Sequence, residues 1–571
     1  MQRRSFIIST ASALSLGALG LSRAGASPAR TPSVSSLQAR LTAANDALIP
    51  DLLRRLTQRG VVVDTYGIPT AQDTARLISV LASARHAPGS RHHRDPGLLD
   101  PLERAASALL DAQHDDGTID LVATNFHSPP DTAFVVEFIA PLTALLNREA
   151  DPSEARLRAH LEKFLRRAGE ALVTGGVHTP NHRWVVCAAL SAIHAQSPDP
   201  RYVSRINQWL AETIDIDSDG QYTEKSTSVY SPVVDRALLT VARHLNRPDL
   251  RDPVRRNLEM TLFYVHPDGE VVTEASKRQD KYQRGSMARY YYSYRTLARL
   301  YGNGRFAAMA AQIERTAEAQ LTSELLTFLA EPEFAADLPP PLPLPDNYAK
   351  VFASSQLARI RRGKVSATIL AQNSTLFSFR KGAAALEALR FASAFFGKGQ
   401  FVGEALEIRN GAYLIEQRLD GPYFQPLSAD QMAGGEHVRM APNGTLAVGG
   451  RAARTQSNVQ HLLSRATVSE DSGRFRLQLE ITGTDGVPVA VELAFRHGGR
   501  LEGVTPVEGI ANAWLLKSGT GRFSVGEDTI TFGPGHVEHT WTQLRGALPQ
   551  WDGQSVYLTG LTPFQINIEI S

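Results

Sequence analysis

The chain has 571 residues, which is enough for a large hydrophobic core and for more than one domain. Its 60 Lys and Arg residues nearly balance its 58 Asp and Glu residues, so the formal net charge is +2 and no overall positive field indicates nucleic acid as a partner. Apolar residues make up 43% of the chain, which excludes a disordered protein, and the single cysteine, Cys187, excludes an intrachain disulfide.

Residues 1–26 have the features of an export signal. Arg3-Arg4 begins a twin-arginine pattern, a modest apolar segment follows through Leu21, and Ala24-Gly25-Ala26 is typical of a cleavage site. The segment is too short and too rich in small residues for a good membrane span. We therefore expect a twin-arginine signal peptide that is removed, a periplasmic or secreted protein, and no membrane attachment after cleavage.

From residue 37 to residue 335 the hydrophobic pattern is helical, with apolar residues three and four positions apart. Three of the expected helices open with a small hydroxyl residue followed by proline, a pair that suits a helix start. The pairs are Ser128-Pro129, Thr179-Pro180 and Ser231-Pro232, and their prolines lie 51 and 52 residues apart. Such a period predicts repeated two-helix units.

A second marker recurs in the same region. Asp116-Gly117, Asp219-Gly220 and Asp268-Gly269 each follow an expected helix and lead into a short extended piece. Asp-Gly favours a turn because glycine adopts positive φ freely. We interpret residues 37–335 as helical hairpins joined on one rim and stacked into an (α/α) toroid, so that polar residues beside the helix starts face one mouth.

The proline-rich stretch 336–348 predicts a stiff linker, because proline stops helices. Beyond it the pattern changes to alternation, most strictly over residues 475–481 and again over 489–495. Short alternating segments with glycine-rich turns predict that residues 349–571 form an antiparallel β-sandwich. The expected fold class is therefore α+β and multidomain.

Two short motifs sharpen this prediction: Asn181-His182 at a helix start, and the stretch 219–226, Asp-Gly-Gln-Tyr-Thr-Glu-Lys-Ser, which leads to Tyr230. Together with the toroid and sandwich they resemble the α/α-toroid polysaccharide lyases, particularly the heparinase II/III-like and related alginate or glucuronan lyase families. The resemblance implies that Asn181 neutralises a uronate carboxylate and that Tyr230 is the Brønsted acid and base. It also implies that His182 assists as base or carboxylate partner.

β-Elimination explains why such residues are needed. The proton at C5 of a uronate is weakly acidic because the adjacent carboxylate is already negative, so hydrogen-bond donors must stabilise the enolate-like intermediate. A phenolate or imidazole then takes the proton. Because the ordinary pKa of tyrosine is about 10, a nearby cation must favour the phenolate, and His182, Arg236 and Arg278 are the candidates.

Further residues beside the helix starts and turns are expected to bind the substrate: Asn125, His127, Arg183, Tyr222, Glu224 and Arg278. Each also has a purely structural interpretation, and Tyr222 is the rival of Tyr230. We expect no cofactor. A structural divalent metal stays open, but no ligand set is identified, since strand alternation would place His536 and His539 on opposite faces.

The sequence thus predicts an exported polysaccharide lyase whose partner is an anionic, uronate-containing polysaccharide or oligosaccharide and whose products carry a 4,5-unsaturated sugar. Three alternatives remain. A glycoside hydrolase on the same fold would need two carboxyl groups, available among Glu224, Asp131, Asp235 and Glu274. A uronate C5-epimerase would share the proton abstraction, and a carbohydrate-binding protein would lack catalysis. The sequence leaves the polymer, endo or exo action and the oligomeric state open.

Overall fold

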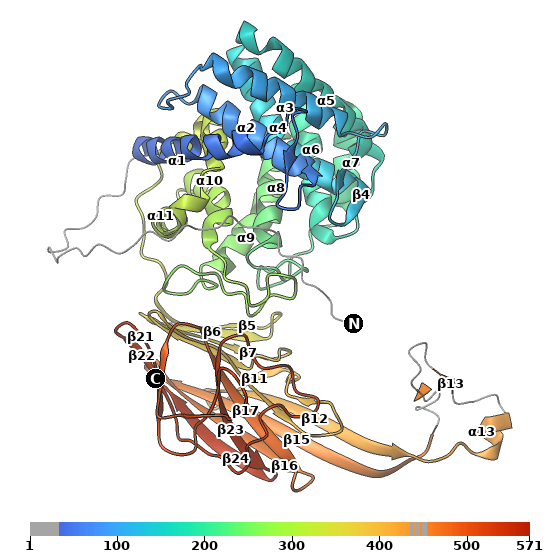
Figure 1. Cartoon of the computed structure of the whole chain (residues 1–571), viewed down its shortest axis with the longest axis vertical. Helices are drawn as coiled ribbons and strands as arrows, with labels where there is room; N and C mark the ends of the chain where they lie inside the picture. The colour runs from blue at the N-terminus through green and yellow to red at the C-terminus, as the bar shows by residue number, and fades with distance from the viewer. Residues whose placement is uncertain (1–33, 434–438, 441–445, 448–453) are drawn as a thin grey trace.

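The computed structural model describes residues 34–433, 439–440, 446–447 and 454–571. The predicted signal peptide, residues 1–26, lies outside them. Figure 1 shows two parts in succession along the chain, a helical part above and a strand-rich part below. The expected order, helical hairpins first and an antiparallel sheet domain second, is confirmed.

The helices of the first part are α1 (Val34–Arg55), α2 (Ala71–His86), α3 (Leu99–Asp111), α4 (Pro129–Glu149), α5 (Ala155–Thr174), α6 (Pro180–Gln196), α7 (Pro200–Ala211), α8 (Tyr230–His244), α9 (Arg251–Thr261), α10 (Tyr291–Tyr301), α11 (Gly304–Ala317) and α12 (Glu324–Ala330). Helices α2, α4, α6, α8 and α10 pack in sequence as one layer, while α3, α5 and α7 pack beside one another and pair with the helices that precede them. Helix α12 packs against α1, α2 and α4, which brings the end of the helical part back to its beginning.

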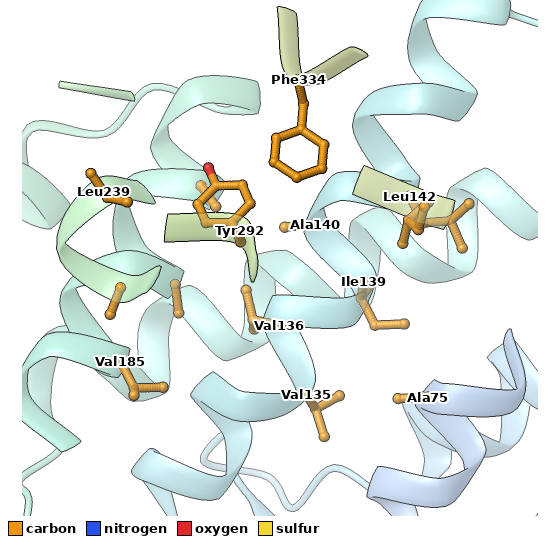
Figure 2. Close-up of a cluster of buried hydrophobic side chains, with 14 of the residues drawn as sticks. Ala75, Val135, Val136, Ile139, Ala140, Leu142, Val185, Leu239, Tyr292 and Phe334 are labelled. Atoms are coloured by element: carbon orange, nitrogen blue, oxygen red, sulfur yellow. The ribbon is translucent and has the colours of Figure 1, made fainter. Parts of the chain in front are cut away.

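The core of the helical part is built around α4. Figure 2 shows Val135 and Val136 of α4 in one cluster with Ala75 of α2, Val185 of α6 and Tyr292 of α10. By length and apolar composition α4 is one described helix that could cross a membrane, but 67% of its most apolar window is buried. It is therefore an inner helix of the ring.

The Asp-Gly turns seat each extended piece against an outer helix. Gly117 and Gly220 have φ of +83° and +92°. A Cβ at Gly117 would lie 2.2 Å from the carbonyl oxygen of Arg167, and a Cβ at Gly220 would lie 2.5 Å from that of Arg256. Only glycine fits such a close approach at positive φ. The carbonyl of Gly220 is held in addition by the side-chain amide of Asn257, at 2.8 Å.

The helix starts follow the predicted pattern with two differences. Ser128 caps α4 through its Oγ, which accepts a backbone N–H of the first turn at 3.3 Å. Thr179 makes no such capping bond at α6, and its Oγ1 lies 3.4 Å from Oδ1 of Asn181 instead. Helix α8 begins at Tyr230 rather than at Pro232, so Tyr230 belongs to the first turn.

Short strands in the helical part are β1 (Val62–Val63), β2 (Pro69–Thr70), β3 (Ile119–Leu121) and β4 (Asn125–Ser128). Residues 336–346 have no helix or strand. The second part contains β5 (Asn347–Phe352), β6 (Leu357–Arg362), β7 (Val365–Leu370), β8 (Phe377–Lys381), β9 (Ala384–Ser393), β10 (Gly399–Gln400), β11 (Leu406–Arg409), β12 (Ala412–Phe424), β13 (Arg439–Met440), β14 (Leu446–Ala447), β15 (Gln456–Asp471), β16 (Arg474–Gly483), β17 (Pro488–Phe495), β18 (Arg500–Glu502), β19 (Thr505–Pro506), β20 (Ala513–Leu515), β21 (Gly521–Val525), β22 (Asp528–Gly533), β23 (Gln554–Leu561) and β24 (Phe564–Ile570), with the short helix α13 (Ala429–Ala433).

These strands form two sheets that share one core. The larger has the order β19-β20-β23-β17-β9-β8-β7-β6-β5 with β10 beside β9, and the other has the order β11-β12-β15-β16-β24-β22-β21-β18. The described pairs are antiparallel except β20 with β23, which is parallel. Side chains of both sheets, such as Phe377 of β8 and Phe475 of β16, meet with ring centroids 5.2 Å apart. The second part is thus a sandwich, as predicted.

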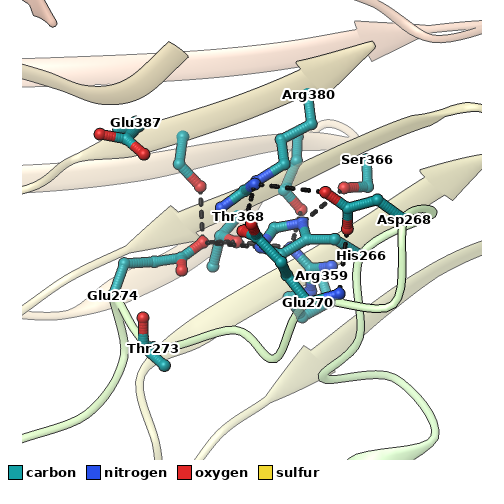
Figure 3. Close-up of polar contacts among 12 residues, drawn as sticks. His266, Asp268, Glu270, Thr273, Glu274, Arg359, Ser366, Thr368, Arg380 and Glu387 are labelled. Carbon is teal, nitrogen blue, oxygen red and sulfur yellow. Dashed lines mark hydrogen bonds and ion pairs between the residues drawn. The ribbon is translucent and has the colours of Figure 1, made fainter. Parts of the chain in front are cut away.

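Buried polar contacts join the sandwich to the loops of the helical part, as Figure 3 shows. Glu274 accepts hydrogen bonds from the hydroxyls of Thr368 and Ser378, both at 2.7 Å, and His266 Nδ1 lies 2.9 Å from Ser366 Oγ. All five side chains are buried. The loop between α9 and α10 is therefore fixed against β7 and β8.

The charges of this contact are compensated. Glu270 forms ion pairs with Arg380 at 2.7 Å and with Arg496 at 2.8 Å. Burial alone would raise the pKa of Glu274, but His266, whose Nε2 lies 3.8 Å from Glu274 Oε1, and the charges of nearby arginines, among them Arg380, hold that pKa well below its ordinary value. Glu274 is thus an ionised, fully engaged carboxylate of the interface.

Candidate functional site

The starts of α4, α6 and α8 and the loop 275–286 meet at the mouth of the ring that faces the sandwich. The backbone N–H of Asn181, in the first turn of α6, donates to Glu224 Oε2 at 3.2 Å. Glu224 Oε1 lies 3.8 Å from a guanidinium nitrogen of Arg278, and the guanidinium of Arg278 lies 5.1 Å from the ring centroid of Tyr230. The predicted residues Asn181, Glu224, Arg278 and Tyr230 are therefore neighbours, although up to 97 positions separate them in the chain.

Asn181 presents an unused hydrogen-bond donor. Its side chain is 1% exposed, and its Nδ2 makes no hydrogen bond within 3.5 Å among the described residues, although the side chain is near enough to Glu224 to lower the pKa of that carboxyl in part. A buried amide without a partner costs stability unless a ligand or water satisfies it. The first turn of a helix also carries partial positive charge, and here the backbone N–H of Asn181 already donates to the Glu224 carboxylate. This position therefore suits a carboxylate.

His182 lies beside Asn181 in a mainly apolar setting. Its ring meets that of His178 edge-on at 4.8 Å and that of Phe134 at 5.9 Å, and its Nδ1 has no partner within the described chain. Burial, reinforced by the nearby charges of His178 and Arg278, lowers the pKa of His182 to about 4. His182 is therefore neutral at neutral pH and is not the cation that the sequence suggested for Tyr230.

Tyr230 is half-buried, and its hydroxyl accepts a hydrogen bond from Nε2 of Gln279. Its backbone N–H donates to Ser226 Oγ at 3.1 Å. Of the three cations proposed for Tyr230, Arg278 is the one that lies over its ring.

The loop that supplies Gln279 is held in place by its buried aspartate, Asp280. Asp280 is 1% exposed, and its carboxylate accepts from Ser226 Oγ at 3.0 Å, from the backbone N–H of Ser228 at 3.0 Å and from Ser276 Oγ at 2.9 Å. These contacts fix the loop against the segment that leads to Tyr230.

The residues before α4 lie on the rim. Asn125 Nδ2 donates to Asp131 Oδ2 at 2.9 Å, and the charge of Asp131 acts on His182. His127 is exposed, pairs with Asp116 at 3.0 Å and stacks on His114 at 3.7 Å. Asn125 therefore adjoins the site through Asp131, whereas His127 is engaged with the Asp-Gly turn.

Two predicted substrate contacts are wrong. Arg183 is the next residue after His182, but its side chain pairs with Glu212 at 3.0 Å and Asp215 at 2.7 Å and lies over the Trp184 ring at 4.7 Å. The helix has turned this residue away from the mouth, because successive residues of a helix point about 100° apart.

The second correction concerns Tyr222. It is 2% exposed, and its hydroxyl donates to the fully buried Asp235 at 2.8 Å. Burial raises the pKa of Tyr222 well above its ordinary value, so it is a neutral core residue. Arg236 is also unsuited to its predicted role, because it pairs with Glu324 at 2.7 Å and Glu137 at 3.1 Å inside the ring.

The sequence analysis missed His178, Phe134 and Ser226. The signal for His178 was its position four residues before His182, which places an aromatic neighbour near a helix start. Ser226 gave no signal beyond its membership of the motif, because its partner Asp280 is 54 residues away.

Within the described residues, no group of three or more His, Cys, Asp or Glu side chains is placed to hold a metal ion. His536 pairs with Glu538 at 2.8 Å, and His539 contacts the carbonyl of Gly560 at 3.1 Å. The pair noted in the sequence is thus engaged within the sandwich.

A ring of helical hairpins followed by an antiparallel sandwich is the fold of the α/α-toroid polysaccharide lyases, and this chain has that fold. The chondroitin AC lyase of Streptomyces coelicolor A3, solved with chondroitin sulphate, matches with a TM-score of 0.54 and 14% identity over 96% of this chain and 80% of that one. Heparinase III matches with a TM-score of 0.55 and 11% identity over 96% and 87%. A Paenibacillus xanthan lyase matches with a TM-score of 0.55 and 10% identity over 95% of this chain and 57% of its own.

At these identities the likeness shows the fold. No protein-family model matches the chain, and no curated protein matches it in sequence. The assignment of chemistry therefore depends on the residues at the mouth.

Proposed function

We propose that the protein is a polysaccharide lyase that cleaves a uronate-containing polymer by β-elimination. The observation that carries the proposal is the pairing, at one mouth, of a buried unpartnered amide at Asn181 with a phenol at Tyr230 that has a donor on its oxygen and a cation on its ring. The first group suits a uronate carboxylate, and the second suits proton transfer beside it.

The proposed reaction balances without water. The Tyr230 phenolate takes the proton from C5, and the electrons of the broken C–H bond form the enolate-like intermediate, which Asn181 and Arg278 stabilise. Those electrons then form the C4–C5 double bond as the bond from C4 to the glycosidic oxygen breaks. The proton returns to the leaving oxygen, which gives one unsaturated end and one new hydroxyl.

His182 has two roles open to it. As a neutral imidazole it can donate to the substrate carboxylate, or it can accept the C5 proton while Tyr230 serves only as the acid. In the second case Tyr230→Phe would block departure of the leaving group but preserve exchange of the C5 hydrogen with solvent. Exchange measured in that variant decides between the two roles.

Two of the four carboxyl groups considered for a glycoside hydrolase are engaged away from the mouth. Asp235 is fully buried against Tyr222, and Glu274 belongs to the contact with the sandwich. Glu224 and Asp131 remain near the mouth. Because burial, the largest effect, raises the pKa of Glu224, this carboxyl holds its proton more firmly than an exposed one.

The test is a panel of anionic polysaccharides, including alginate, glucuronan, hyaluronan, chondroitin and heparan sulfate, assayed by the ultraviolet absorbance of the conjugated product. Growth of this signal on any of them supports a lyase. New reducing ends without absorbance would establish hydrolysis, and C5 exchange without cleavage would establish epimerisation.

Tyr230→Phe should lower turnover by roughly 10²–10⁴-fold. The matched control is Tyr222→Phe, which removes the same hydroxyl from a buried tyrosine outside the site and should preserve turnover per folded molecule. Full activity of Tyr230→Phe would remove the assignment.

We also propose export of the folded protein by the twin-arginine route, because of the sequence of residues 1–26. Replacement of Arg3 and Arg4 by lysine should retain the protein in the cytoplasm of a bacterial host. Export that is unaffected would contradict this.

A further inference from the structure

The loop beside Tyr230 carries an unusual arrangement of charge. Its sequence from residue 275 to residue 286 is Ala-Ser-Lys-Arg-Gln-Asp-Lys-Tyr-Gln-Arg-Gly-Ser, which holds four basic residues and one acid. The acid, Asp280, is turned inward and satisfied by serine hydroxyls and a backbone N–H. The positive charges of the loop are therefore not neutralised from within it.

Three lysines and one arginine form what we call the basic patch: Lys225, Lys277, Arg278 and Lys281. The backbone N–H of Lys277 donates to the carbonyl of Lys225 at 2.8 Å, which joins the two loops. Burial and the like charges of Lys225 and Lys281 lower the pKa of Lys277, so these ammonium groups act on one another. Among the described residues, no carboxylate forms an ion pair with any of the three lysines.

Contacts with the sandwich part hold the segments that carry the patch. Lys225 Nζ donates to the carbonyl of Ser354 in the sandwich part at 3.2 Å. Beyond Lys281, the hydroxyl of Tyr282 donates to Asn373 Oδ1 at 3.1 Å and its ring packs edge-on against Trp551 at 4.6 Å. The loop is thus held by the helical part at Asp280 and by the sandwich at Tyr282.

A folded protein gains nothing by holding like charges together without counter-charges, because their repulsion opposes folding. Elsewhere in the described chain most such cations have partners, as Arg183, Arg236 and Arg496 do. An anionic ligand would supply the missing charge. Arg278, one member of the patch, lies over the ring of Tyr230, so the patch adjoins the proposed reacting group.

We infer that the basic patch binds a second anionic group, carried by the sugar next to the uronate at which Tyr230 acts. The position of this second group relative to the cleaved bond rests on the proposed function. The inference adds the substrate class, which is a polymer with anionic charge beyond a single carboxylate at the cleavage point. That charge is a sulfate ester or the carboxylate of an adjacent uronate. Both present oxygen acceptors that ammonium groups bind as point charges.

The experiment measures binding and cleavage separately on polymers matched in backbone. Chondroitin and chondroitin sulfate differ in sulfate alone, and glucuronan carries a carboxylate on every sugar. Binding is measured by titration calorimetry in two salt concentrations, and cleavage by initial rates of product absorbance. The variants are Lys277→Gln, Lys281→Gln and the double variant, with Lys277→Arg as the change that keeps the charge.

The matched control is Lys163→Gln with Lys517→Gln. Both lysines are exposed and lie outside the patch, on α5 and in the sandwich, so this pair removes the same net charge. We expect the double patch variant to bind the doubly charged polymer about tenfold more weakly and with a smaller dependence on salt, whereas the control pair and Lys277→Arg bind as the unmodified protein does. A loss on chondroitin sulfate but not on chondroitin identifies sulfate, and a loss on glucuronan identifies the adjacent carboxylate.

The two proposals fail differently. If no polymer yields unsaturated product but the patch variants still lose affinity, the lyase assignment fails and the anion site stands. If cleavage occurs and the patch variants bind and cleave all polymers as the unmodified protein does, the anion site is refuted. A loss equal to that of the control pair would also refute it, because the effect would then come from overall charge.

Discussion

Asn181→Ala tests the site most sharply, because we expect a large loss of activity and little change in stability. The Asn181 side chain is 1% exposed, yet its Nδ2 has no partner in the described chain, and the hydrogen bond to Glu224 comes from the backbone N–H, which alanine keeps. If the amide exists to bind a carboxylate, its removal harms the reaction and spares the fold.

The magnitudes follow from these contacts. Loss of one donor that stabilises developing negative charge lowers turnover by roughly 10²–10³-fold, or about 3–4 kcal/mol. In the free protein the unpaired amide already costs about 1–3 kcal/mol of desolvation, so its removal offsets the small cavity left behind. We expect the free energy of unfolding of Asn181→Ala to change by less than about 1 kcal/mol.

The assay pairs initial rates of unsaturated product with thermal unfolding. Asn257→Ala is the control, since this buried amide does donate, to the carbonyl of Gly220 at 2.8 Å, and its loss leaves that carbonyl unpaired. Asn257→Ala should therefore lower the unfolding temperature while the surviving folded enzyme stays active. Asn181→Asp should be less active than Asn181→Ala because it places a negative charge against the uronate. An Asn181→Ala protein with full activity and a large loss of stability would refute the reasoning.

Three further predictions concern neighbouring groups. The pKa of His182 is lowered to about 4 from an ordinary value of 6.5. As the pH falls from 6.5 to 4, the unfolded chain therefore binds a proton at this histidine before the folded protein does, and stability is lost. His182→Gln should remove roughly 3 kcal/mol of that loss, measured by denaturant unfolding at several pH values. Glu274→Ala should destabilise the protein by about 3–5 kcal/mol, because it leaves buried hydroxyls and cations unpaired, and calorimetry should show the helical and sheet parts unfolding less cooperatively. Tyr222→Phe should lower stability by about 1–3 kcal/mol, since Asp235 loses its donor, and an unchanged unfolding temperature would contradict the core role.

The sequence predicted the helical half well because its signals are local. A proline at the first helical position and a glycine at positive φ act within a few residues, and both recur with the repeat. Once hairpins stack, the starts of α4, α6 and α8 must meet on one side. The meeting of Asn181 with Tyr230 and Glu224 follows from that repeat, so it could be anticipated from sequence.

The errors concern which way a side chain points. Tyr222 and Glu224 belong to one short piece with a single bridge, from Ile216 to Tyr222, and nothing in the sequence says which of them turns into the core. Arg183 was misplaced because its partners Glu212 and Asp215 arrive with the next hairpin. Orientation set by distant partners leaves no local pattern.

In the sheet half the strands were predictable but their environments were not. Residues 475–481 lie within β16, which alternates between buried and exposed positions as expected. Residues 489–495 lie within β17, which is buried on both faces although its sequence also alternates. The second face of β17 is covered by a network in which Glu492 binds Arg390 and the backbone N–H of Trp551. Burial of polar residues in such a network cannot be predicted from the alternation of apolar and polar residues alone.

Tyr222 and the residues at the start of α6 differ in how their polar atoms are partnered. Tyr222 donates to Asp235 Oδ1 within the core, and the second carboxylate oxygen of Asp235 has no partner in the described chain. In the first turn of α6, Asn181 and His182 each hold a buried nitrogen without a partner in the described chain, near the Arg278 guanidinium that lies over Tyr230. Two such groups side by side lower stability unless water or a ligand satisfies them. Because Glu224 already accepts the backbone N–H of Asn181, a substrate carboxylate under the proposed function would bind to the side chains of Asn181 and His182 rather than to that N–H.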